Sequence, residues 1–209
     1  MKKIVFLLFL LAVSVAAGRA QESRQDISIS GFGIVEPFVA SSTDVQVHSN
    51  TGIGGVVGYR FMLTPTSALE VNYGMDYQNT FRYIVSNTNV VKVTARTQEI
   101  SGAYVRSFVF RKWNPFVEGG PAALIFLPVR NSGTTSIDVK QQTTIAGMFG
   151  AGFAYEISPS FDIRCEYRGL VTKVPDFGQG AGATNTNLNT NRWYKPWISE
   201  PLIGVAYHF

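Results

Sequence analysis

The C-terminal residues 201–209 are PLIGVAYHF, and their pattern indicates the fold. From residue 203 its odd positions are large and apolar, and small or polar residues stand between them. A period of two is that of a strand with one apolar face. Chain ends usually fray into water, so a soluble protein rarely stops on such a strand with an aromatic last residue. A membrane barrel does, because closure pairs the last strand with the first and aromatic residues ring each bilayer interface.

The last three residues, Tyr207-His208-Phe209, resemble the C-terminal aromatic-x-Phe signal by which the outer-membrane barrel proteins of Gram-negative bacteria are recognised for assembly. The resemblance implies that Tyr207 and Phe209 form an assembly signal. It also implies that the barrel assembly machinery is a partner of this chain.

Residues 1–20 have the organisation of a cleaved signal peptide. A basic start, Met1-Lys2-Lys3, precedes an apolar run over 4–15, and Gly18-Arg19-Ala20 ends on a small residue suited to cleavage. The apolar run is shorter than the roughly 20 residues that a membrane helix needs. We expect cleavage after Ala20, which would leave residues 21–209 as one barrel domain of an exported protein.

Removal of the predicted signal peptide changes the charge balance. Of 18 basic residues, Lys2, Lys3 and Arg19 leave with it, so 15 basic residues face 14 acidic ones and the net charge falls to about +1. No basic stripe is then left to follow phosphates, and we expect no nucleic-acid partner. The single cysteine, Cys165, excludes an internal disulfide.

Eight segments of alternating apolar and polar residues follow. In the third, Leu69, Val71, Tyr73, Met75 and Tyr77 alternate with polar residues and glycine, and the strand can run on to residue 83. The fourth is ambiguous in register, and we place Arg106 inside. The predicted strands are 26–36, 52–61, 69–77, 94–108, 116–129, 143–157, 161–171 and 201–209. Bacterial single-chain barrels have an even number of strands and begin at eight.

The connections alternate strictly in length. Short ones cover 63–67, 111–115 and 158–160, and long ones cover 37–51, 79–93, 128–142 and 175–196. Outer-membrane barrels have this pattern of tight periplasmic turns and longer extracellular loops. The sequence therefore predicts an all-β, eight-stranded antiparallel up-and-down transmembrane β-barrel. Motifs such as GMFGAGFAY at 147–155 make it similar to the small barrel family that includes the OmpA transmembrane domain and OmpX.

Charged residues recur on the inward faces of the predicted strands. An eight-stranded barrel is only wide enough for side chains, and buried charges must be paired to be tolerated. We interpret this inward set, which includes Arg168, as an ion-paired plug of the lumen, and we expect Arg60 and Glu200 to lie near it. The alternative is a narrow pore in which the pairs rearrange to pass small ions. The predicted lumen charge network is Glu70, Arg106, Glu118, Arg164 and Glu166.

The sequence does not favour catalysis. The two histidines, His48 and His208, lie at opposite ends of the predicted barrel and cannot share a site. A lipid A-modifying enzyme is the third interpretation, because His48-Ser49 resembles the His/Ser/Glu arrangement of the lipid A deacylases. It ranks last because the His-x-Ser spacing of those enzymes is missing. No metal or cofactor is expected. We expect a monomeric, non-enzymatic outer-membrane protein with a structural or surface-interaction role, embedded among outer-membrane lipid and lipopolysaccharide, with an extracellular partner bound through the long loops.

Overall fold

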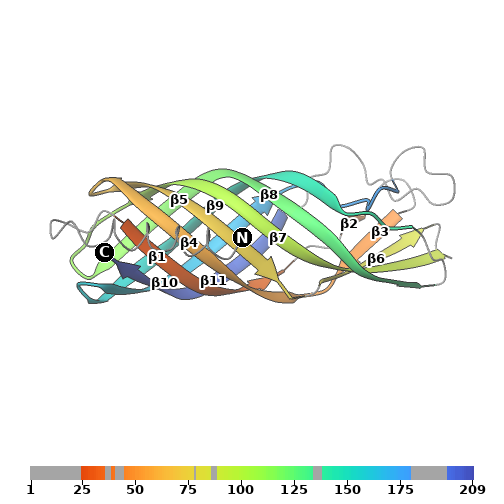
Figure 1. Ribbon diagram of the computed structural model, residues 1–209, viewed down its shortest axis with the longest axis horizontal. Helices are drawn as coiled ribbons and strands as arrows, with labels where there is room; N and C mark the ends of the chain where they lie inside the picture. The colour runs from red at the N-terminus through yellow and green to blue at the C-terminus, as the bar shows by residue number, and fades with distance from the viewer. Residues whose placement is uncertain are drawn as a thin grey trace, which may run out of the picture.

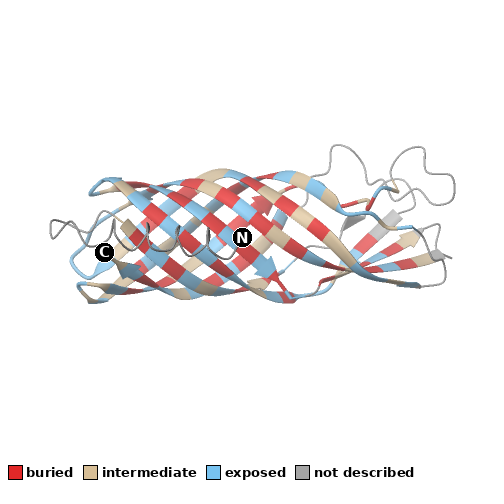
Figure 2. Cartoon of the chain, viewed as in Figure 1, coloured by how far each residue is buried: buried red, intermediate tan, exposed pale blue. Residues whose placement is uncertain are grey.

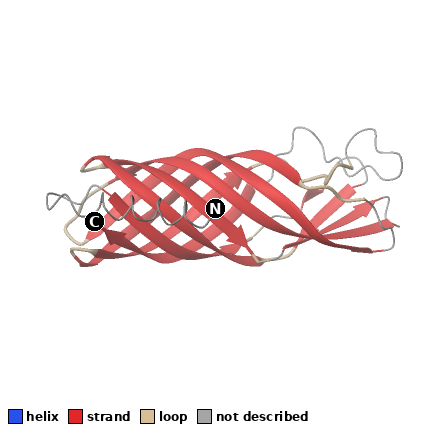
Figure 3. Ribbon diagram, viewed as in Figure 1, coloured by secondary structure: helices blue, strands red, loops and turns tan. Residues whose placement is uncertain are grey.

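The computed structural model describes residues 25–35, 39–40, 45–77, 79–85, 89–133, 138–179 and 197–209, and its regular elements are strands (Figures 1 and 3). No helix in these ranges is long and apolar enough to cross a membrane. The predicted signal peptide, residues 1–20, lies outside the described residues. The strands are β1 (Gln25–Ile34), β2 (Val39–Ala40), β3 (Val45–Ser49), β4 (Gly52–Thr64), β5 (Ser67–Asp76), β6 (Asn79–Val85), β7 (Asn89–Ser107), β8 (Trp113–Gly133), β9 (Gln142–Ser158), β10 (Phe161–Val171) and β11 (Trp197–His208).

Eight of these strands close into a barrel. Their order is β4-β1-β11-β10-β9-β8-β7-β5, and β5 pairs back with β4. Neighbouring strands are antiparallel throughout, and the seam between the first and last strands sets Ile29 opposite Val205. Closure leaves no open edge within the barrel. The predicted eight-stranded antiparallel transmembrane barrel is confirmed.

The two faces of the barrel wall differ as the alternation predicts. Exposed and buried residues alternate along most of the length of the barrel strands (Figure 2). Large apolar side chains cover the outside, with Ile145 81%, Ile53 72% and Ile203 63% exposed. At the end with the short turns, Trp113 packs against Tyr155 with ring centroids 4.8 Å apart, as part of an aromatic girdle. An apolar outer band with an aromatic girdle suits contact with lipid.

Two predicted long loops contain strands instead. The predicted loop 37–51 includes β2 and β3, and the predicted loop 79–93 is formed by β6 and the first part of β7. The cause is an apolar alternation in which Phe81, Tyr83, Val91 and Val93 all point inward and are buried. The sheet therefore continues past the closed barrel at the end with the long connections, to the right in Figure 1. We call this the loop end and the opposite end the turn end.

Candidate functional site: the barrel lumen

The lumen is divided into two layers. The half nearer the turn end holds charged side chains, and we call it the charged layer. The half nearer the loop end holds apolar side chains such as Phe32, Leu124, Leu170 and Ile198. The charged layer consists of Asp26, Arg60, Glu70, Glu99, Glu118, Asp162, Arg164, Glu166, Arg168 and Glu200.

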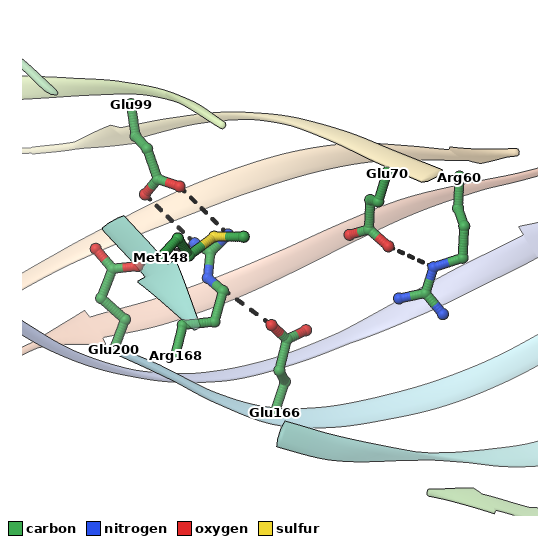
Figure 4. Close-up of polar contacts among 7 residues, drawn as sticks. All are labelled: Arg60, Glu70, Glu99, Met148, Glu166, Arg168 and Glu200. Carbon is green, nitrogen blue, oxygen red and sulfur yellow. Dashed lines mark hydrogen bonds and ion pairs between the residues drawn. The ribbon is translucent and has the colours of Figure 1, made fainter. Parts of the chain in front are cut away.

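Arg168 of β10 is the centre of the charged layer (Figure 4). Its guanidinium group lies 3.0 Å from Glu200 Oε2, 3.4 Å from Glu99 Oε1 and 3.9 Å from Glu166 Oε1. The planar fork of arginine can serve several carboxylates from different strands at once. Gly150, opposite Arg168 on β9, leaves room for this side chain, because a Cβ there would lie 3.1 Å from Glu118 Cγ and 3.2 Å from Arg168 Cγ. One side chain thus ties β7, β10 and β11 together across the lumen.

A second ion pair joins neighbouring strands of the wall. Arg60 of β4 stands directly opposite Glu70 of β5, and its Nε donates to Glu70 Oε2. The Arg60 guanidinium also lies over the ring of Phe116, 4.9 Å from the ring centroid. Both charged groups are buried, and the contact with the ring face adds a cation–π attraction.

A third group closes the turn end. Arg164 Nη2 donates to Asp26 Oδ2 at 2.7 Å, which links β10 to β1. His208 Nε2 lies 2.9 Å from Asp162 Oδ2, and its Nδ1 lies 3.8 Å from Asp26 Oδ2. The polar faces of the first and last strands are therefore tied to each other and to β10. On the outer face, Tyr207 stacks on Phe209 at a centroid distance of 6.1 Å.

Four of the five predicted network residues lie inside the barrel. Glu70, Glu118, Arg164 and Glu166 do so, but no ion pair joins two of them. Glu70 pairs with Arg60, Arg164 with Asp26, and Glu166 with Arg168. Asp26 and Glu99, which pair with Arg164 and Arg168, were not predicted for the lumen. Their inward position follows from strand register, which the sequence pattern left unresolved at Glu99.

The inward placement of Arg106 was wrong. Arg106 is exposed and shares the outer face with Tyr104, while Ala103 and Val105 are buried inside. Arg106 Nη1 and the Tyr104 hydroxyl both donate to Ser67 Oγ, at 2.8 and 2.9 Å. Near a bilayer interface a long arginine side chain can keep its charge in water, so an outward arginine is tolerated there. The same register turns Glu99 inward.

Carboxyl groups outnumber cations in the described lumen. With Asp76, near the loop end, eight carboxyl groups face three guanidinium groups. Glu118 carries the imbalance most clearly, because neither of its carboxyl oxygens has a hydrogen-bond partner and it interacts with the neighbouring Glu166. The described residues include no group of three or more side chains placed to hold a metal ion. The ion-paired plug is therefore acidic.

An aromatic cluster fills the lumen at the loop end. Phe177, in the segment after β10, inserts its ring among those of Phe81, Tyr83 and Phe126, with centroid distances of 5.6, 6.4 and 6.4 Å. The Tyr83 hydroxyl donates to the Pro175 carbonyl at 2.6 Å. We call these four rings the aromatic cap. The aromatic cap was not predicted from the sequence, because Phe177 lies in a predicted long loop.

Hydrogen bonds hold the segment that carries Phe177. Gln142 Oε1 accepts hydrogen bonds from the amides of Asp176 and Phe177, both at 2.8 Å, and the Lys140 amide donates to the Phe177 carbonyl at 3.0 Å. Phe177 and Gly178 have positive φ angles of 49° and 81°, which turn the chain over the lumen. The cap is thus fixed to β9 as well as to β6 and β8.

The closed antiparallel sheet, the apolar outer face and the charged interior define a small transmembrane β-barrel of the outer-membrane type. The chain belongs to the outer membrane protein beta-barrel domain family, whose model matches residues 5–209. No curated protein matches the sequence.

Several solved structures of outer-membrane barrels are similar to this chain. The outer membrane protein OprG from Pseudomonas aeruginosa has 12% sequence identity and a TM-score of 0.58, with 90% of this chain and 96% of that chain covered. Neisserial surface protein A (NspA) has 14% identity and a TM-score of 0.53, with 90% of this chain and 98% of that chain covered. At these identities the likeness shows the fold alone.

Proposed function

We propose that this chain is a non-enzymatic outer-membrane barrel with a sealed lumen and a structural or surface-interaction role. The observation that carries the proposal is the double closure of the lumen. Arg168 and its three carboxylates bridge the charged layer, and the aromatic cap fills the loop end. An eight-stranded barrel has no space for an aqueous path around such side chains.

The proposed orientation follows the rule for outer-membrane barrels. Short turns face the periplasm and long connections face outward, so the loop end with its extended sheet lies at the cell surface. In this arrangement Tyr207 and Phe209 serve as the signal for the barrel assembly machinery. The protein acts as a monomer among outer-membrane lipid and lipopolysaccharide, and an extracellular partner binds at the loop end.

Cysteine labelling in intact cells tests this orientation. Lys173 at the loop end and Lys112 at the turn end are both exposed, so each is replaced with cysteine in a Cys165→Ala background. A membrane-impermeant maleimide is expected to label Lys173→Cys in intact cells and Lys112→Cys only after the outer membrane is permeabilised. The reverse pattern would refute the proposed surface role, and Cys165→Ala alone controls for background labelling.

A narrow cation pore is the second candidate function. The excess of carboxyl groups in the lumen favours it, because rings of acidic side chains select cations. Conduction would require both Arg168 and Phe177 to move, since each closes the lumen in a different layer. The closed geometry therefore favours the sealed barrel over the pore.

A further inference from the structure

The sheet that continues past the barrel carries a row of basic side chains on its outer face. The strand register places His48 of β3 opposite Arg82 of β6, Arg82 opposite Lys92 of β7, and Lys92 opposite Ser132 of β8. These side chains are exposed, while Val47, Phe81, Tyr83 and their neighbours point the other way into the apolar core. The row therefore lies on one surface that runs across four strands.

Two more cations extend this surface. Arg130 of β8 stands opposite Thr94, two residues along β7 from Lys92, and Arg96 follows two residues further. We call Arg82, Lys92, Arg96 and Arg130 the basic face, with His48 at its edge. The ion pairs among the described residues include none of these four cations.

This arrangement is unfavourable without an anion. Side chains directly opposite each other on neighbouring strands have Cβ atoms about 4.5–5.5 Å apart, and like charges at that separation destabilise a sheet. Arg82 and Lys92 form such a like-charged pair. The described acidic side chains of β5, β7 and β8 all point into the lumen, so the sheet itself does not balance the pair. The basic face is thus suited to a multivalent anion.

The position of the basic face relative to the lipid-facing band identifies the kind of anion. On the outer face of β7 the residues from turn end to loop end are Tyr104, Gly102, Ile100, Gln98, Arg96, Thr94 and Lys92. Ile100 is the last large apolar side chain of this series. At about 3.3 Å per residue, Arg96 lies roughly 13 Å along the strand beyond Ile100. The cations therefore begin where lipid headgroups begin.

An apolar groove adjoins the basic face. It is open to the outside and is lined by Ile53, Gly54, Gly55, Met75, Asp76, Tyr77 and Arg96. Ile53, Met75 and Tyr77 are all well exposed on the outer face. An apolar groove beside a cation fits a molecule that has hydrocarbon next to an anionic group. A soluble polyanion has no hydrocarbon to place there.

We propose that the basic face and its groove bind a phosphorylated glycolipid of the outer leaflet, of the lipid A class. One phosphate is shared by Arg82 and Lys92, since a guanidinium fork and an ammonium group can both donate to phosphate oxygens. Arg96 and Arg130 bind a second anionic group nearer the membrane, and part of an acyl chain lies in the groove. This inference rests on the proposed function, because it requires the loop end to face the outer leaflet.

The test compares two variants that each lose one arginine and one lysine. Arg82→Gln/Lys92→Gln removes two cations of the basic face, and Arg111→Gln/Lys112→Gln removes two exposed cations at the turn end. The full refolded protein in phosphatidylcholine nanodiscs is titrated with bisphosphorylated lipid A and with dephosphorylated lipid A. At about 1 kcal/mol per cation near an anionic surface, the first variant is expected to bind bisphosphorylated lipid A roughly thirtyfold more weakly than the native protein.

The turn-end variant is expected to bind like the native protein, and raised salt should weaken native binding because exposed charges are screened. Equal affinity of the Arg82→Gln/Lys92→Gln variant for bisphosphorylated lipid A would overturn the proposal. Native binding that does not depend on the lipid phosphates would also overturn it. The proposal would also be overturned if sucrose octasulfate, a soluble polyanion, bound the basic face and bisphosphorylated lipid A did not.

The two proposals fail in different experiments. If Lys173→Cys is labelled only after permeabilisation, the proposed orientation fails whatever the lipid affinity. If Lys173→Cys is labelled in intact cells and lipid A affinity is insensitive to Arg82 and Lys92, only the lipid site fails.

Discussion

Replacing Arg168 with methionine is expected to lower the free energy of unfolding by about 3–5 kcal/mol, because removal of one partner leaves buried charge uncompensated. Methionine replaces the unbranched aliphatic stem of arginine but leaves the carboxylates of Glu99, Glu166 and Glu200 without their shared cation. These groups come from β7, β10 and β11, so the loss affects strands on several sides of the lumen. Urea unfolding of the protein refolded in lipid vesicles measures the change.

Arg106→Met is the matched control for this prediction. The same substitution on the outer face removes only a hydrogen bond to Ser67, and we expect a loss of about 1 kcal/mol. If Arg168→Met cost no more than Arg106→Met, the Arg168 cluster would not hold the barrel together. That result would also count against the Arg168 cluster as one of the two closures of the lumen.

Glu118 and Glu70 are expected to respond with opposite signs to the same substitution. Glu70→Gln breaks the buried pair with Arg60 and should cost about 3–5 kcal/mol of unfolding free energy. Glu118→Gln removes a buried carboxyl that has no hydrogen-bond partner and lies beside Glu166. Relief of that like-charge contact should raise the unfolding free energy by about 1 kcal/mol.

The two variants are compared by urea unfolding under identical lipid and pH conditions. Because both carry the same chemical change in the same lumen, a general effect of glutamine on refolding cancels between them. A loss of stability in Glu118→Gln similar to that in Glu70→Gln would contradict the excess of carboxyl groups over cations in the lumen. It would mean that attraction of Glu118 to the neighbouring arginines outweighs its repulsion from Glu166.

The barrel could be predicted from the sequence because the lipid outside and the polar lumen inside favour different residues on the two faces of each strand. Apolar and polar residues therefore alternate with a period of two. In β5 the outward Leu69, Val71 and Tyr73 and the inward Glu70 and Asn72 can be read directly from the alternation. The inward face of the fourth predicted strand could not be assigned in the same way. Tyr104 and Arg106 share a face, and an arginine near an interface is compatible with either side, so the pattern did not identify Glu99 as a partner of Arg168.

Other features depend on contacts between segments far apart in sequence. Phe177 closes the lumen through rings from β6 and β8, and no local pattern in a predicted loop marks an aromatic residue for that position. The cation row arises from the register of β3, β6 and β7, since Arg82 and Lys92 meet only when these strands pair. Such features follow from pairing between strands, which alternation within one segment does not determine.

Single-channel conductance of the refolded protein in a planar bilayer tests the sealed lumen most directly. Arg164→Ala is measured alongside, because Arg164 lies in the lumen and pairs with Asp26. With the Arg168 cluster and the aromatic cap both in place, correctly folded native protein and Arg164→Ala are expected to give no current steps. Reproducible current steps from the native protein that change in Arg164→Ala would contradict the sealed barrel and establish the pore.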